Sequence, residues 1–189
     1  MQISIQPPET FSAFAATDLG AAYADETGLL KAEVARVMRA QFAEYNVTIL
    51  SSDDEPEPIE PHATIHFGGV DGRFLGLGED VDRYNQDSSD QAIVYTQDFA
   101  LYAVMRLTPE DEARMVANVA SHELGHLLGL YHSRGTGQLM DDSSSAWDLV
   151  GELKLERAPL AESVFPFGME DCARVLAEGV GRAAEAATP

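Results

Sequence analysis

The sequence is poor in cysteine and has no long hydrophobic run, and each shortage excludes a class of protein. Cys172 is the one cysteine, so an internal disulfide is impossible and the fold is not a disulfide scaffold. The longest uninterrupted apolar run, Phe99 to Met105, has seven residues. A bilayer crossing needs roughly 18, so we expect no membrane-spanning segment.

Basic residues are also scarce. The chain has 12 Lys and Arg against 32 Asp and Glu, a formal net charge of −20. Nucleic acids and anionic membranes attract basic surfaces, so we expect neither as a partner. The charge fits a secreted protein, a salt-tolerant one, a calcium binder or simply a very soluble one. We expect a secreted monomer, although the first basic residue is Lys31 and no signal peptide is recognisable.

The length and apolar content are sufficient for one domain with a core. The chain has 189 residues, of which 45% are hydrophobic, and this excludes a disordered tail. Hydrophobic periodicity and turn residues predict an alternation of helices and short strands. The expected strands are Ile3–Ile5, Val47–Leu50 (buried), Ala63–Phe67, Phe74–Leu77 and Ala92–Thr96, and the expected helices are Leu29–Tyr45, Thr108–Leu128, Trp147–Arg157 (short) and Met169–Ala187.

The start and the end of the predicted helix Thr108–Leu128 are both marked by residue type. Thr108 can accept a hydrogen bond from a free amide of the first turn, and Pro109 suits the first helical position. The acidic residues that follow favour the positive end of the helix dipole. Gly129 supplies the stop, since glycine readily adopts the conformation that ends a helix.

The stretch from His122 to His132 is the most informative part of the sequence. It holds three of the five histidines, at positions 122, 126 and 132. His122 and His126 are four residues apart on a helix, so both imidazoles project from one face and can bind one ion. Gly129 permits a sharp turn that brings His132 back toward the same ion, and Glu123 lies next to the first ligand.

Three neutral imidazoles with one open coordination position are typical of catalytic rather than structural zinc. Zinc lowers the pKa of its bound water from about 15.7 toward 7 and polarises a carbonyl group. Glu123 would accept the proton of that water as a general base. The predicted reaction is hydrolysis of a peptide bond without a covalent intermediate, and the predicted partner is a protein or peptide substrate.

The residues also permit a less specific interpretation. A histidine pair at four-residue spacing occurs by chance on many helices, and the site would then be an accident or an inactive relic. The agreement of five specified positions with an independently predicted helix favours the zinc hydrolase. The leucines of this stretch are expected to pack in the core.

The His122–His132 stretch resembles the extended zinc motif of the metzincin metallopeptidases, His-Glu-x-x-His-x-x-Gly-x-x-His. The segment Gly137-Gln138-Leu139-Met140 resembles the methionine turn of that family, with Met140 eight residues after His132. The short spacing and the serine at position 133 are similar to the matrixin branch. By this resemblance Met140 would form a hydrophobic base beneath the metal and would not be a ligand.

The resemblance implies an α+β fold with an active-site helix, a backing helix and a mixed, mostly parallel twisted sheet. The whole chain would be one catalytic domain. Its α/β-like upper subdomain would end near residue 130, and a smaller C-terminal subdomain would hold the methionine turn and the last helix over residues 131–189. The implied sheet has Ala63–Phe67 and Ala92–Thr96 as inner strands, and Phe74–Leu77 as an exposed edge that pairs with an extended substrate.

Two other groups of residues are weaker candidates for metal binding. Calcium prefers six to eight oxygen ligands, and acidic and amide side chains are concentrated in one loop; a solvated loop is the alternative that we favour. His62 and His66 alternate on one predicted strand and are interpreted as ordinary strand residues rather than as a second metal site. The loop residues in question are Asp80, Asp82, Asn85, Asp87 and Asp90, with Asp71 nearby.

Two functions are therefore open at this point. The first is a zinc-dependent endopeptidase with His122, His126 and His132 on the metal and Glu123 as base. The second is a non-catalytic zinc-containing module of the same fold that binds peptides or proteins. Glu123 favours the first, since a metal cradle without catalysis has no use for a base.

Overall fold

The computed structural model describes residues 14–135, 137–142, 144–165 and 167–184 and has a mixed α+β fold. The strand predicted at Ile3–Ile5 lies outside these residues. In chain order the elements are η1 (Ala16–Asp18), η2 (Ala21–Tyr23), α1 (Thr27–Gln41), β1 (Thr64–Phe67), β2 (Gly76–Gly78), β3 (Gln91–Val94), η3 (Thr96–Met105), α2 (Pro109–Leu127), α3 (Ala146–Leu149), β4 (Arg157–Pro159), β5 (Met169–Asp171) and α4 (Cys172–Gly179), where η denotes a 3-10 helix.

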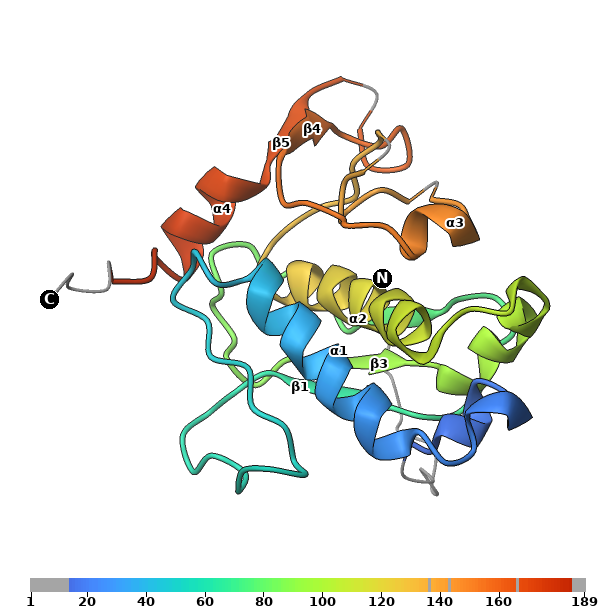
Figure 1. Cartoon of the computed structure of the whole chain (residues 1–189). Coiled ribbons are helices and arrows are strands. Elements are labelled where there is room, and N and C mark those ends of the chain that lie inside the picture. The colour runs from blue at the N-terminus through green and yellow to red at the C-terminus, as the bar shows by residue number, and fades with distance from the viewer. Residues whose placement is uncertain (1–13, 136, 143, 166, 185–189) are drawn as a thin grey trace, which may run out of the picture.

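Helix α2 runs through the middle of the molecule (Figure 1). It begins as predicted, because the Thr108 side chain accepts a hydrogen bond from the Asp111 amide at 3.2 Å and Pro109 occupies the first turn. Most of its residues from Glu112 to Leu127 are buried. A helix that is covered on nearly all sides is held rigidly, so side chains from its last two turns have fixed positions.

Helix α1 packs against α2 and supplies the other side of the core (Figure 1). Its buried residues recur at three- and four-residue spacing, as the periodicity predicts. The helix ends at Gln41, earlier than predicted, yet Phe42 and Tyr45 beyond its end are also buried. The buried face is formed by Leu30, Val34, Ala35, Val37 and Met38.

The sheet differs from the one predicted. Its order is β1-β3-β2, with β1 parallel to β3 and β2 antiparallel to it, so it is mixed but not mostly parallel. The central strand is β3, whereas β1 has a strand partner on one side only among the described residues. The prediction of Ala63–Phe67 as an inner strand is therefore wrong for this part of the chain. Strand β2 lies at the other edge; it begins two residues later than the predicted strand Phe74–Leu77 and ends one residue later.

The prediction of a buried strand at Val47–Leu50 is wrong. This segment has no assigned strand structure, and Thr48 and Leu50 are exposed while Val47 and Ile49 are half-buried. The Ile49 carbonyl accepts a hydrogen bond from Arg39 Nε instead of from a neighbouring strand. An apolar run alone does not make a strand, because the partner strand comes from elsewhere in the chain.

The C-terminal segment contains a two-stranded sheet that the sequence analysis misses. Strands β4 and β5 pair antiparallel, and in Figure 1 they lie above α2 with α3 and α4. The predicted helix Met169–Ala187 therefore begins later, at Cys172, where the Asp171 side chain accepts from the Arg174 amide. It ends at Gly179, and residues 185–187 lie outside the described chain. In place of the predicted helix Trp147–Arg157 the structure has the shorter helix α3 (Ala146–Leu149).

None of the helices that the structure describes has both the length and the apolar character that a bilayer crossing requires.

Candidate metal centre

Three histidines meet at the C-terminal end of α2. His122 and His126 come from the last two turns of the helix, and His132 comes from the segment after it. His126 Nε2 lies 3.1 Å from His122 Nε2 and 3.1 Å from His132 Nε2. Among the described residues this is the one group of three or more histidine, cysteine or acidic side chains whose ligand atoms converge, all within 4.8 Å of one another.

Two backbone carbonyl groups orient the helical histidines. The Leu139 oxygen lies 2.8 Å from His122 Nδ1, and the Leu130 oxygen lies 2.8 Å from His126 Nδ1. A carbonyl oxygen only accepts, so Nδ1 must carry the proton and Nε2 keeps its lone pair. The remaining lone pairs therefore point at one another, which is favourable only around a cation. The histidines are predictable from the sequence, whereas these carbonyl groups are not.

The histidines are also held in the neutral form that metal binding requires. Burial lowers the pKa of His122 to about 4. It lowers the pKa of His126 to about 3, with a further contribution from the other two histidines. Burial lowers the pKa of His132 as well. At neutral pH all three side chains offer a free lone pair.

The distances from His126 Nε2 to the other two ligand nitrogens fit zinc. Tetrahedral zinc with Zn–N bonds of about 2.0–2.1 Å places two ligand nitrogens about 3.3 Å apart. The observed separations of 3.1 Å are close to this value. Three nitrogen donors leave one position for water or substrate, as at catalytic zinc sites. His122, His126 and His132 therefore have the chemistry and the spacing to hold one zinc ion.

The turn that separates His126 from His132 is built on Gly129. Its φ of 90° lies in the left-handed region, which glycine adopts without strain. The space beside it is also filled, because a Cβ atom at this position would lie 2.8 Å from the Asp82 carbonyl oxygen and 2.9 Å from Arg83 Cα. Any side chain here would push the loop after β2 away from the helix end.

Glu123 lies next to the histidines and faces the edge strand β2. Its side chain is 7% exposed, and burial raises its pKa to about 8, with a backbone hydrogen bond from Gly78 acting in the opposite direction. A Cβ atom at Gly76 would lie 2.6 Å from Glu123 Oε1, so the carboxylate rests directly on the glycine backbone. The roles of Gly76 and Gly78 are not predicted from the sequence, although a Gly-x-Gly pattern in a predicted edge strand is a usable signal of close approach.

Met140 lies beneath α2 in a buried position. A Cβ atom at Gly125 would be 2.5 Å from Met140 Sδ, so the thioether fills the space that this glycine leaves. The Met140 carbonyl accepts from the Ser133 amide at 2.7 Å, which ties the methionine to the residue after His132. The side chain is 1% exposed and packs under the helix turn between the two helical ligands.

The acidic residues proposed for calcium are used in local contacts. The Asp82 carboxylate accepts from the Asp87 amide, and the Asp87 carboxylate accepts from the Ser89 amide. Burial, then repulsion from Asp82, raises the pKa of Asp90 to about 6. In the described chain these carboxylates do not join a group of converging metal ligands, so the structure gives the calcium prediction no support.

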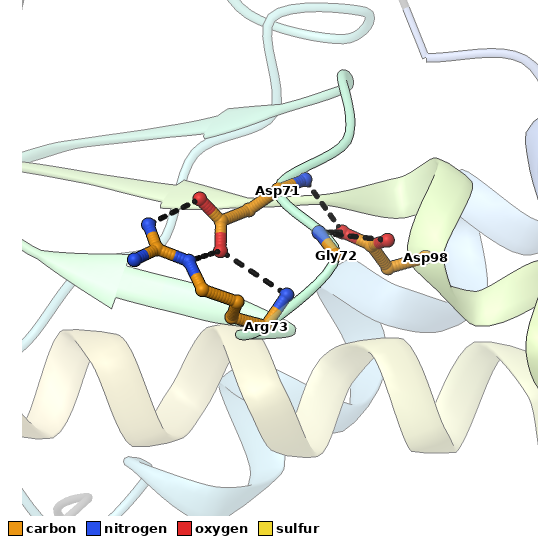
Figure 2. A network of polar contacts seen from close by, with 4 residues as sticks. All are labelled: Asp71, Gly72, Arg73 and Asp98. Carbon is orange, nitrogen blue, oxygen red and sulfur yellow. Dashed lines mark hydrogen bonds and ion pairs between the residues drawn. The ribbon is translucent and has the colours of Figure 1, made fainter.

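Asp71 belongs to a separate network in the loop between β1 and β2. Figure 2 shows its carboxylate paired with the Arg73 guanidinium, with the shortest contact at 3.1 Å. The Asp98 carboxylate from η3 accepts from the Asp71 and Gly72 amides. These contacts fix the path of the chain into β2 and hence the position of the glycines that cover Glu123.

Among the residues that the structure describes, His62 and His66 do not join a metal-binding group either. His62 Nδ1 lies 2.9 Å from the Glu60 carbonyl oxygen, and His66 Nε2 lies 3.3 Å from Gln91 Oε1. These partners agree with their interpretation as ordinary residues in and before a strand.

Comparison with known proteins agrees with the geometry. The family model of the matrixins matches residues 31–156, that is 126 of 189 residues. No curated protein and no solved structure gives a significant match to the chain. The matched region includes α1 from Lys31 onward, the whole of α2, the three-stranded sheet and the three histidines. The chain therefore belongs to the matrixin family, and its three converging histidines fit the zinc motif of that family.

Proposed function

We propose that the protein is a zinc-dependent endopeptidase. The observation that carries this proposal is the convergence of three neutral imidazoles beside the buried carboxylate of Glu123. His122, His126 and His132 would hold the zinc ion. When bound, zinc supplies an activated water and polarises the carbonyl group of the scissile bond. A matrixin is a metallopeptidase, so the substrate is a protein or a peptide.

Glu123 is proposed as the general base. It follows the first ligand on the helix, and its carboxylate is shielded from bulk water. Burial raises the pKa of Glu123, whereas a bound dication would lower it. A carboxylate with a pKa near the working pH would accept a proton from water and donate it to a leaving amine.

The edge strand β2 is proposed to align the substrate. On its free side it has no strand partner in the described part of the chain, so its backbone groups there, apart from the Gly78 amide that bonds to Glu123, can pair with an extended peptide. The absence of side chains at Gly76 and Gly78 brings the strand close to α2. A peptide paired with β2 would therefore pass near Glu123 and the three histidines.

Met140 is proposed as the hydrophobic base of the metal site. Its packing against Gly125 and its bond to the Ser133 amide support this role. We also propose that residues 131–189 form the smaller subdomain of a single catalytic domain, with Met140 at its junction with α2.

A peptide library assayed with wild type and with Glu123→Ala tests the proposal, with zinc content measured in parallel. We expect equal zinc and loss of cleavage in the variant, and recovery of wild-type cleavage when zinc is added back after chelation. Cleavage that persists in excess chelator would contradict the metal mechanism. If neither protein cleaves any peptide although both bind zinc, the non-catalytic binding module is correct.

A further inference from the structure

We propose that Arg83 is a positioning residue for the third metal ligand. This inference rests on the proposed zinc site, but it concerns a residue outside the zinc motif. Arg83 lies in the acidic loop between β2 and β3, and its side chain clamps the turn that separates His126 from His132. Through that turn it fixes where His132 meets the other two ligands.

The side chain of Arg83 contacts the turn at two places. Its Nη1 donates to the Gly129 carbonyl oxygen at 3.0 Å, and its guanidinium lies 5.5 Å from the centre of the Tyr131 ring. Gly129 is the residue at which the chain reverses, and Tyr131 directly precedes His132. A planar guanidinium can donate a hydrogen bond in its plane and stack on an aromatic ring with its face.

The backbone of the same loop holds the helix end from the other side. The Asp82 amide donates to the His126 carbonyl oxygen at 3.0 Å, and the Gly129 amide donates to the same oxygen at 2.9 Å, so the loop is tied to the last turn of α2. The close approach at Gly129 described above allows this contact. Loop and turn therefore form one unit, in which Arg83 supplies the contacts to the part nearest His132.

Glu170 anchors the guanidinium. Its carboxylate lies 3.1 Å from Arg83 Nη1 and is 3% exposed, and it comes from β5, far along the chain. A carboxylate so deeply buried requires a cation or donors nearby. Arg83 therefore links the loop after β2, the turn after α2 and the C-terminal sheet. A single basic side chain thus joins three segments of the described chain near the metal ligands.

The expected consequence of losing Arg83 is weaker metal binding. The two helical histidines would keep their positions, because α2 and the carbonyl groups of Leu130 and Leu139 hold them. His132 would lose the restraint on the preceding residues. Loss of a residue that orients ligands typically weakens metal affinity by about 10- to 100-fold. Because Arg83 acts through the turn rather than on a ligand, we expect an increase of about tenfold in the zinc dissociation constant.

The test measures zinc affinity by competition with a chromophoric chelator in the full chain. Arg83→Gln should bind zinc about tenfold more weakly than wild type. Arg83→Lys keeps the charge for Glu170 but loses the flat stacking surface, and Glu170→Gln keeps the contacts to the turn; each should give a smaller loss. Either of these two variants decides the question if Arg83→Gln fails to fold.

Arg134→Gln is the matched control. It removes the same charge two residues after His132, yet within the described part of the chain the Arg134 side chain pairs with the exposed Glu162 and contacts no metal ligand. Its zinc affinity should equal that of wild type. The free energy of unfolding in excess chelator is measured for all variants, since a purely structural role would lower it while leaving zinc affinity unchanged.

The inference is overturned if the folded Arg83 and Glu170 variants bind zinc as tightly as the control. That result would leave the zinc site itself intact. Absence of zinc binding in wild type would instead overturn the proposed function, so the two failures are distinguishable.

Discussion

Helix α2 has a buried carboxylate near each of its two ends, and the two carboxylates have different roles. At the N-terminal end Glu112 is 0% exposed, and burial raises its pKa to about 7. At the C-terminal end Glu123 is 7% exposed, and burial raises its pKa to about 8. By proton affinity alone the two residues are nearly indistinguishable.

Their neighbours are what differ. Glu112 accepts a hydrogen bond from the Tyr23 hydroxyl at 3.3 Å, and that hydroxyl lies 3.0 Å from the Leu107 carbonyl oxygen. No described histidine cluster faces it, and it is closed in by the core. Glu123 follows His122 in the sequence and lies under an edge strand, where a Cβ atom at Gly78 would lie 3.6 Å from its Oε2 and 3.4 Å from His126 Cβ. A shifted carboxylate therefore marks a reactive site only where ligands and an open strand edge accompany it.

The largest effect should come from removing one ligand. His126→Ala should reduce cleavage to the level of the chelated protein, since two imidazoles hold zinc far less tightly than three. Zinc content and peptide cleavage measure this. His66→Ala removes an exposed strand histidine and should keep both properties. If His126→Ala retained stoichiometric zinc, the assignment of the C-terminal end of α2 as the metal site would be wrong.

The next largest effect concerns Glu112, at the N-terminal end of α2, and the pH dependence of the protein's stability. The pKa of Glu112 in the folded protein is about 7, above its ordinary 4.5. Between these values the folded state binds more protons than the unfolded state, so this residue makes stability fall as pH rises. Across that interval the contribution is roughly 3 kcal/mol.

Glu112→Gln removes this titration. Urea unfolding of the zinc-loaded proteins should give similar stabilities near pH 5 and a more stable variant, by roughly 3 kcal/mol, near pH 8. Cleavage per zinc-loaded molecule should stay unchanged. Stability curves that run parallel over the whole range would show that Glu112 is not the titrating group.

A smaller effect should follow from filling the space above Glu123. Gly76→Ala places a methyl group 2.6 Å from Glu123 Oε1, so the carboxylate must move. A displacement of about 1 Å at a catalytic group can lower kcat about ten- to hundredfold. Zinc affinity should not change. Gly28→Ala is the control, since no atom lies within 4 Å of the added methyl group there; a kcat equal to wild type in both variants would contradict the positioning of Glu123 by β2.

The smallest effect should come from the helix cap. Thr108→Ala removes the side chain that accepts from the Asp111 amide and should cost about 1 kcal/mol of stability. Zinc affinity and kcat should remain those of wild type, because the cap lies at the end of α2 remote from the histidines. A loss of zinc affinity in this variant would show that the two ends are coupled.

The features that the sequence predicts well are local. The start of α2 follows from Thr108 and Pro109, and the convergence of His122, His126 and His132 follows from their spacing on a helix and around one turn. Short-range geometry determines these features, so the residue types and their spacing along the chain are enough to predict them.

The features that the sequence does not predict depend on distant partners. The segment Val47–Leu50 has the composition of a strand but no strand beside it. The acidic loop suggests an ion site, whereas its Asp82 amide bonds to the His126 carbonyl oxygen, and its Arg83 side chain bonds to the Gly129 carbonyl oxygen and to Glu170. In each case the outcome depends on what another part of the chain brings to that place, which periodicity and composition do not encode.

X-ray absorption at the zinc edge of the purified protein tests the central claim most directly. We predict one zinc ion per chain with a first shell of light atoms at about 2.0–2.1 Å, and outer-shell scattering that fits three imidazoles. The spectrum should contain no sulfur, since Cys172 and Met140 lie outside the ligand set. A sulfur ligand, or fewer than three imidazoles, would contradict the account.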